Sequence, residues 1–208
     1  MKNNYAFIDN QNLNLGIQKL GWKMDWRKFR AFLREKYGVE KAFMFIGYMP
    51  ENEDLYNQMH DAGYLVVLKP TLEMFKTPAP ELTPKPPEPN DQYKTFGEQA
   101  ADSLNPIETK AAPVPPARAV KGNVDAELVL YSIKEMPNYD KAIIISGDGD
   151  FFSVLEYLRE QGKLAHLMVP NRQYSSLLKP FEDSLVRLDQ KKRELSYRHG
   201  RFFQKPKN

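Results

Sequence analysis

Residues 142–151, which read AIIISGDGDF, decide the fold. Four apolar residues without polar alternation are typical of a strand that is buried on both faces, as in a parallel sheet. The run ends abruptly at Ser146, and Asp148 and Asp150 follow, each preceded by a glycine. In an open parallel sheet, the residues just past the carboxyl end of a strand line the ligand crevice. The stretch therefore predicts a parallel sheet with acidic side chains at one edge.

Apolar runs and helical patterns alternate on both sides of this stretch. Further buried strands are predicted at residues 5–8, 42–46, 64–68 and 164–169. Helices are predicted at 25–37, 53–62, 124–136 and 151–161 from apolar residues at helical spacing. In the helix at 124–136, this spacing places Ala126, Val129, Ile133 and Met136 on the core side. The alternation is typical of βαβ units and of a doubly wound α/β sheet.

A proline-rich insertion interrupts this pattern. Residues 76–119 hold ten of the sixteen prolines, and proline cannot donate to a sheet or continue a helix. We expect one discontinuous domain, made of residues 1–75 and 120–189. The insertion is either a tolerated surface loop, or a lid or docking site for a proline-binding protein partner. Residues 190–208 form a basic tail with interleaved aromatic residues, which is typical of a single-strand-binding segment and equally of a solvated terminus.

Composition excludes several classes of protein. The absence of cysteine removes disulfides, zinc sites with thiolate ligands and cysteine nucleophiles. There is no signal peptide pattern and no apolar stretch long enough to span a bilayer, so we expect a cytoplasmic protein without a membrane partner. A net charge of +3 is too small to argue for nucleic-acid binding by itself. The sequence does not indicate an oligomeric state.

Acidic residues stand at three predicted junctions between elements. Asp9 directly follows the first strand, Asp148 and Asp150 follow the fourth, and Asp125 opens a helix. Asp9 lies close to Asp148 and Asp150 if their strands are neighbours. Spacing alone does not decide whether Asp125 belongs to the same cluster. Each position also has a simpler interpretation: an Asx turn at Asp9, a helix cap at Asp150, and a charge that favours the helix dipole at Asp125.

A carboxylate cluster would favour a hard divalent cation. Carboxylates that are packed together raise one another's pKa unless a cation occupies the cluster. The available ligands are oxygens, which indicate magnesium or manganese rather than zinc. Such an ion can bind a phosphate oxygen and lower the pKa of a water for in-line attack.

Three short motifs resemble the NYN domain, in its LabA-like branch within the PIN-like nuclease superfamily. They are residues 7–13 (FIDNQNL), 121–125 (KGNVD) and 146–151 (SGDGDF). The resemblance implies a PIN-like three-layer α/β/α sandwich with a central, mainly parallel sheet. It also implies a magnesium or manganese site formed by Asp9, Asp125, Asp148 and Asp150. Asn12 would brace the first aspartate, and Ser146 would position the backbone of the site or a water.

Two functions follow from these observations. The first is a metal-dependent ribonuclease that acts on RNA, most simply single-stranded RNA, in RNA processing or turnover. Asn10, Lys121 and Arg172 would then contact the substrate or brace the site. The alternative is a non-catalytic RNA-binding or protein-interaction module that retains the divalent-metal site. RNA rather than DNA is what the resemblance implies, since no single residue distinguishes the two.

Overall fold

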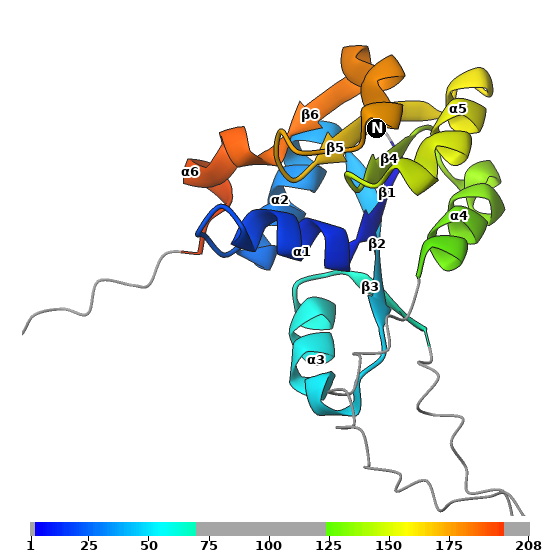
Figure 1. Ribbon diagram of the computed structural model, residues 1–208. Helices are drawn as coiled ribbons and strands as arrows, with labels where there is room; N and C mark the ends of the chain where they lie inside the picture. The colour runs from blue at the N-terminus through cyan, green and yellow to red at the C-terminus, as the bar shows by residue number, and fades with distance from the viewer. Residues whose placement is uncertain (1–2, 70–123, 198–208) are drawn as a thin grey trace, which may run out of the picture. The chain divides into compact units, whose positions relative to one another are not determined.

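Six parallel strands form one sheet, in the order β3-β2-β1-β4-β5-β6, in the computed structural model of this chain (Figure 1). The structure describes residues 3–69 and 124–197. The strands are β1 (Asn4–Asp9), β2 (Val39–Gly47), β3 (Leu65–Lys69), β4 (Ala142–Ile145), β5 (Leu164–Val169) and β6 (Leu185–Arg187). This is the strand order of a doubly wound sheet, so the predicted α/β class is confirmed.

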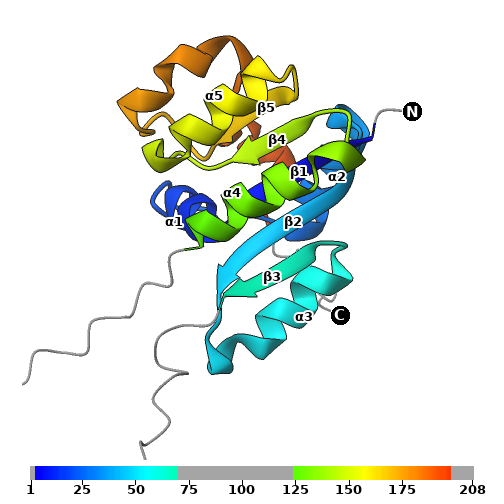
Figure 2. The ribbon, with the colours of Figure 1, turned by 90° about the vertical axis from the view of Figure 1, so that its right-hand side faces the viewer.

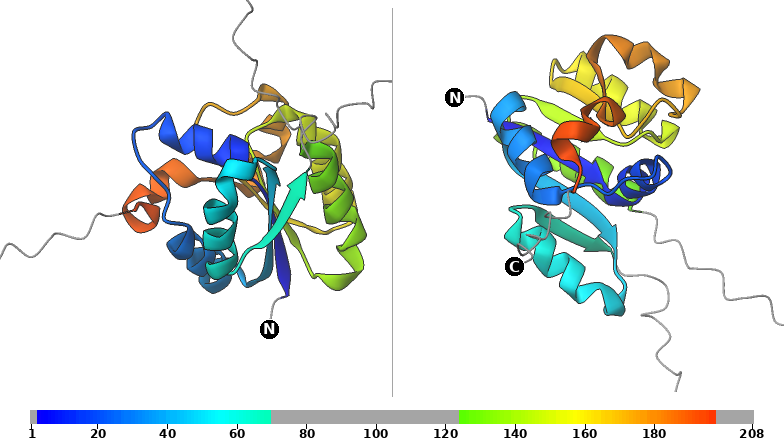
Figure 3. Two further views of the ribbon diagram at one scale, coloured as in Figure 1. Left: turned by 90° about the horizontal axis from the view of Figure 1, so that it is seen from below. Right: turned by 90° about the vertical axis from the view of Figure 1, so that its left-hand side faces the viewer.

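Helices cover both faces of the sheet and give three layers (Figure 2). In Figure 3, α1, α2 and α6 lie on one side and α4 and α5 on the other. The α-helices are α1 (Asn10–Gln18), α2 (Trp26–Tyr37), α3 (Glu53–Asp61), α4 (Asp125–Lys134), α5 (Phe152–Glu160) and α6 (Lys192–Leu195). Short 3-10 helices are η1 (Pro50–Asn52), η3 (Met136–Asn138), η4 (Gly149–Phe151), η5 (Ser176–Ser184) and η6 (Leu188–Lys191).

Successive residues of each central strand face opposite cores. In β1, Ile8 packs with the residues of α1 and α2, whereas Phe7 packs with those of α4 and α5. Both side chains are fully buried. This two-sided burial explains why the strands read as unbroken apolar runs. Burial on both faces also fixes the strand register, since a shift by one residue would exchange the two faces.

The sequence pattern located the central strands and four of the helices, but it missed α1, β6 and α6. Helix α1 was not predicted, because its asparagines and glycine are poor helix formers. It is capped by the Asp9 side chain, which accepts a hydrogen bond from the backbone of Asn12. The three-residue strand β6 and the short helix α6 were also missed.

The predicted core face of α4 is correct only in part, because Val129 and Met136 pack against the core but the other two predicted residues do not. Its buried residues are Leu128 and Ser132, whereas Ala126 and Ile133 are exposed. Tyr131 also packs inward, against Phe45 of β2. The error arose because α4 has apolar residues on two sides, so that helical spacing fits more than one face.

The predicted insertion at 76–119 and most of the predicted tail at 190–208 lie outside the described residues. The division of the chain at these boundaries therefore stays a prediction. Within residues 3–69 and 124–197, no helix is long and apolar enough to cross a bilayer.

Candidate active site

The site begins where β1 and β4 lie side by side. The two strands are parallel neighbours, with Ile8 in register with Ile145. From β1 the chain builds outward through β2 and β3, and later through β4, β5 and β6 on the other side. The carboxyl ends of β1 and β4 therefore form a topological switch point, the usual position of a ligand crevice in such sheets. The expected meeting of Asp9 with the segment after β4 follows from this pairing.

Asp9 is held by hydrogen bonds on both carboxylate oxygens. The backbone N–H of Asn12 donates to Oδ1 at 3.0 Å, and the Ser146 hydroxyl donates to Oδ2 at 3.0 Å. Asp9 is only 4% exposed and Ser146 only 1%. The hydroxyl of Ser146 also accepts from the backbone N–H of Asp148 at 3.1 Å. Ser146 thus links the end of β1 to the acidic turn after β4.

Burial raises the pKa of Asp9. The cause is loss of hydration, to which repulsion from the Asp148 carboxylate adds. Hydrogen bonds from Asn12, Ser146 and the backbone of Gln11 act in the opposite direction and lower it. The protein therefore keeps a buried acidic group beside a second carboxylate, an arrangement that favours a bound cation.

Asn12 braces the turn after β4. Its side-chain Oδ1 accepts a hydrogen bond from the backbone N–H of Gly147 at 2.8 Å. Because the backbone of Asn12 also donates to Asp9, this one residue links the end of β1 to the turn after β4. The side chain of Asp148 then caps η4 by accepting from the backbone of Asp150 at 3.1 Å.

The loop after β5 closes against this turn, which the sequence pattern did not predict. A Cβ atom on Gly149 would lie 2.3 Å from Oγ of Ser175, so this position has no room for a side chain. The carbonyl of Gly147 accepts a hydrogen bond from the backbone of Ser175 at 3.0 Å. Gly149 is therefore needed for close packing of the two loops.

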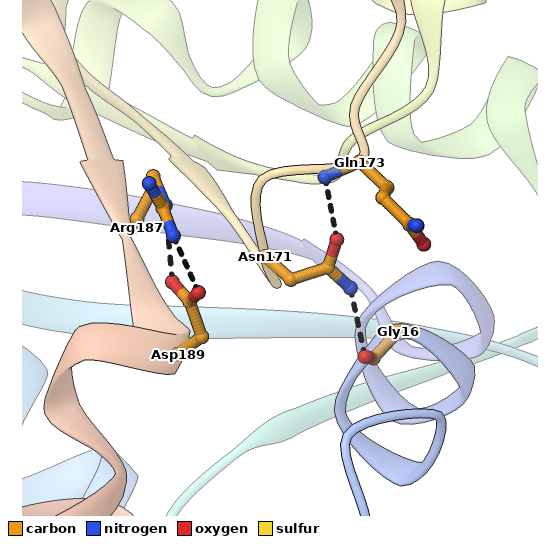
Figure 4. Close-up of polar contacts among 5 residues, drawn as sticks. All are labelled: Gly16, Asn171, Gln173, Arg187 and Asp189. Carbon is orange, nitrogen blue, oxygen red and sulfur yellow. Dashed lines mark hydrogen bonds and ion pairs between the residues drawn. The ribbon is translucent and has the colours of Figure 1, made fainter.

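Asn171 ties the same loop to α1 (Figure 4). Its amide donates to the carbonyl of Gly16 at 2.8 Å, and its Oδ1 accepts from the backbone of Gln173 at 2.7 Å. Asn171 is 4% exposed and lies two residues after β5, but nothing in the sequence indicates its contacts. Figure 4 also shows the ion pair between Arg187 and Asp189, which stabilises the end of β6.

The other two predicted acidic residues lie in the first turns of η4 and α4. Asp150 is exposed and does not cap α5, whose cap is Phe151, so the simpler interpretation of this residue was wrong. Asp125 is the first residue of α4, which contacts β1 and η4. Glu127, in the same turn, forms an ion pair with Lys69 at the end of β3, at 2.9 Å. The sequence analysis had singled out neither member of this pair.

Asn10, Arg172 and Lys121 were the predicted substrate contacts. Asn10 is 8% exposed, and its Oδ1 has no hydrogen-bond partner among the described residues. Arg172 is exposed in the loop after β5, at the same edge as Asp9. Lys121 lies outside the described residues.

The carboxylate oxygens at this edge of the sheet suit a cation that retains much of its hydration shell. Within residues 3–69 and 124–197, no group of three or more His, Cys, Asp or Glu side chains lies close enough to hold a metal. What the structure does bring together is Asp9 and Asp148, through Ser146. Magnesium is commonly bound by one or two carboxylates, with water and substrate phosphates as its other ligands. Two carboxylates fit such an ion, and the four-aspartate set stays a prediction.

Comparison with known proteins agrees with this architecture. The family model of the NYN domain matches residues 88–189. The chain carries an NYN domain. NYN domains are typically nucleases with functions related to RNA. The matched residues include the acidic turn after β4 and the loop after β5, whereas Asp9 lies before them.

A solved structure supports the fold. A protein of unknown function from Vibrio parahaemolyticus is similar with a TM-score of 0.61 and 18% sequence identity. The similarity covers 94% of this chain and 96% of that protein. At this identity it shows the α/β fold alone. No curated protein matches the sequence significantly.

Proposed function

We propose that this NYN domain is a divalent-metal-dependent ribonuclease whose site is centred on Asp9 and Asp148. The observation that carries the proposal is the Asp9–Ser146–Asp148 linkage at the switch point, where a buried carboxylate of raised pKa faces a second carboxylate. Asp125 and Asp150 complete the proposed acidic set. The expected cofactor is magnesium or manganese, and the expected substrate is single-stranded RNA.

Each residue has a distinct proposed role. Asp9 and Asp148 would hold the ion, which when bound supplies charge neutralisation and an acidified water for attack on the phosphodiester. Ser146 and Asn12 keep the Asp9 carboxylate in one orientation through their hydrogen bonds. Gly149 lets the loop after β5 approach closely, and Arg172 on that loop would contact a phosphate.

One observation favours a second candidate function. Because the described residues do not gather three acidic groups, the site could serve to grip RNA through an ion without turning it over. The domain would then be a non-catalytic RNA-binding module. The two functions differ in metal-dependent turnover and not in binding.

The test is cleavage of a labelled single-stranded RNA with manganese or with chelator. We would compare the wild type with a double variant, Asp148→Asn with Asp150→Asn. The matched control is Asp61→Asn with Asp183→Asn, which removes the same charge from exposed positions that precede β3 and β6, at the opposite edge of the sheet. We expect metal-dependent cleavage by the wild type and the control, and none by the site variant. Cleavage that survives the site substitutions would refute the assignment, and binding without any cleavage would favour the second candidate.

A further inference from the structure

The strongest concentration of positive charge in the described structure lies away from the candidate active site, around α2 and α6. Residues 19–37 and 187–197 contain eleven lysines and arginines and four aspartates and glutamates, so their formal net charge is +7. The whole chain has a net charge of only +3. The rest of the chain is therefore acidic on balance, and the charge is unevenly distributed.

The two segments form one surface. Helix α6 packs against α2, and Met24 forms an antiparallel bridge with Ser196. The backbone of Tyr197 donates to the carbonyl of Lys23 at 2.9 Å, and the Lys28 ammonium donates to the carbonyl of Ser196 at 3.0 Å. We call the surface made by Lys23, Arg27, Lys28, Arg34, Lys192 and Arg193 the α2–α6 face.

Most of the acidic charge on this surface is already neutralised. Asp25 pairs with Lys28, Glu35 with Arg34, and Glu194 with Lys36. In contrast, no carboxylate of the described residues forms an ion pair with Lys23, Arg27 or Lys192. All three side chains are exposed. The surface therefore presents basic side chains that form no ion pair with another described residue.

The position of this surface connects it with the candidate active site. Helix α1 starts at Asn10, next to Asp9, and ends at Gln18, shortly before Lys23. Nine residues of α-helix span about 14 Å, a distance that two or three nucleotides of a single strand could bridge. In the sequence, Tyr197 is followed by further basic residues, Arg198, Arg201, Lys205 and Lys207.

We infer that the α2–α6 face binds the phosphate backbone of single-stranded RNA and directs the strand along α1 toward Asp9. The identity of this polyanion rests on the proposed function. A lipid surface fits less well, because the large apolar side chains of α2 are buried or partly buried and cannot insert into a bilayer.

The test is binding of a labelled oligouridine, measured by fluorescence anisotropy in chelator so that no turnover occurs. The variant is Lys23→Glu with Arg27→Glu. Arg27 lies in the first turn of α2, where a glutamate is favourable for the helix dipole, so the fold should tolerate the change. The control is Lys134→Glu with Lys141→Glu, which changes the charge equally at exposed positions near the amino end of β4.

We expect the face variant to bind RNA about tenfold to a hundredfold more weakly. The slope of log affinity against log salt concentration should become smaller by about 1.4, as expected when two phosphate contacts with a single strand are lost. The control should change affinity less than about threefold by the loss of long-range attraction alone. Equal losses in both variants, or no loss in the face variant, would overturn the inference. So would a face variant that loses binding to anionic vesicles while it keeps RNA binding.

This result is separable from that of the cleavage assay. If the wild type cleaves RNA but the face variant binds normally, this inference fails and the proposed function stands. If the face variant loses binding while the wild type shows no cleavage, the RNA surface stands and the nuclease function fails.

Discussion

The hydroxyl of Ser146 donates to the carboxylate of Asp9 across 3.0 Å, although the two residues are 137 positions apart in the sequence. The same hydroxyl accepts from the backbone of Asp148. One buried side chain therefore joins the ends of β1 and β4 and sets the geometry between two acidic groups. The first prediction concerns this contact.

Replacement of Ser146 by alanine should impair both stability and cleavage. It leaves Oδ2 of Asp9 buried without its donor, which typically costs about 1–3 kcal/mol in unfolding free energy. Urea denaturation would measure the loss. Ser146→Thr keeps the hydroxyl and is the control, and it should retain more of the metal-dependent cleavage. Equal cleavage by Ser146→Ala and the wild type would show that the hydroxyl has no role in positioning Asp9.

Asp9→Asn should abolish cleavage and yet stabilise the metal-free protein at neutral pH. The pKa of Asp9 is raised in the folded state by burial and by Asp148, so between the unfolded and folded pKa values the folded protein binds more protons. The unfolding free energy of the wild type therefore falls as the pH rises through this window. Above the window, the buried charge of Asp9 destabilises the folded state by its full amount.

The measurement is the urea midpoint of both proteins in chelator, from acidic to neutral pH. The Asp9→Asn variant should become more stable than the wild type as the pH rises. The difference in stability should vanish below the unfolded pKa of Asp9. A wild type that is the more stable protein at neutral pH would contradict the raised pKa.

Gly149→Ala should destabilise the protein by about 1–3 kcal/mol, as for overpacking of a close contact. The new Cβ would lie 2.3 Å from Oγ and 3.0 Å from Cβ of Ser175. Ser175→Gly removes both atoms, so the double variant should recover part of the loss. A double-mutant cycle on thermal unfolding would measure this coupling, and strictly additive effects would argue against the contact.

Asn171→Ala should loosen the loop after β5. The change removes a partner from the carbonyl of Gly16 and another from the backbone of Gln173, which should cost about 1–3 kcal/mol. Faster hydrogen exchange at Gln173 and Tyr174 would locate the effect. Asn14→Ala breaks the exposed hydrogen bond with Gln18 and should change stability by less than about 0.5 kcal/mol. Similar effects of the two substitutions would contradict a specific role for Asn171.

The sequence was sufficient for the parts of the fold that burial controls. Strand β4 was predicted with its observed bounds, since residues buried on both faces read as an uninterrupted apolar run. Helix α2 was predicted within one residue of its observed bounds because its buried residues, such as Phe29 and Leu33, recur at helical spacing. Helix α1 escaped prediction because its stability comes from tertiary packing and the Asp9 cap rather than from helix propensity.

The same distinction applies to the site. The bracing roles of Asn12 and Ser146 were implied by the resemblance to the NYN domain, whereas Asp9 could be predicted to lie near the turn after β4 because both follow recognisable strands. Asn171 and Ser175 could not, because their contacts depend on how a loop without periodicity folds back onto α1 and Gly149. Arg172 was chosen for its charge, yet its neighbour Asn171 provides the contacts that position the loop. Long-range loop packing leaves no pattern in a single sequence.

The pairing of β1 with β4 also orders the events of synthesis. Asp9 leaves the ribosome well before its partners, because the hydroxyl that orients it is 137 positions later and the backbone N–H that Asn12 binds is 135 positions after Asn12. A nascent chain that stops before β4 contains β1, β2 and β3 but lacks both partners. An incomplete product of translation would therefore carry the first acidic residue in an unassembled and inactive form.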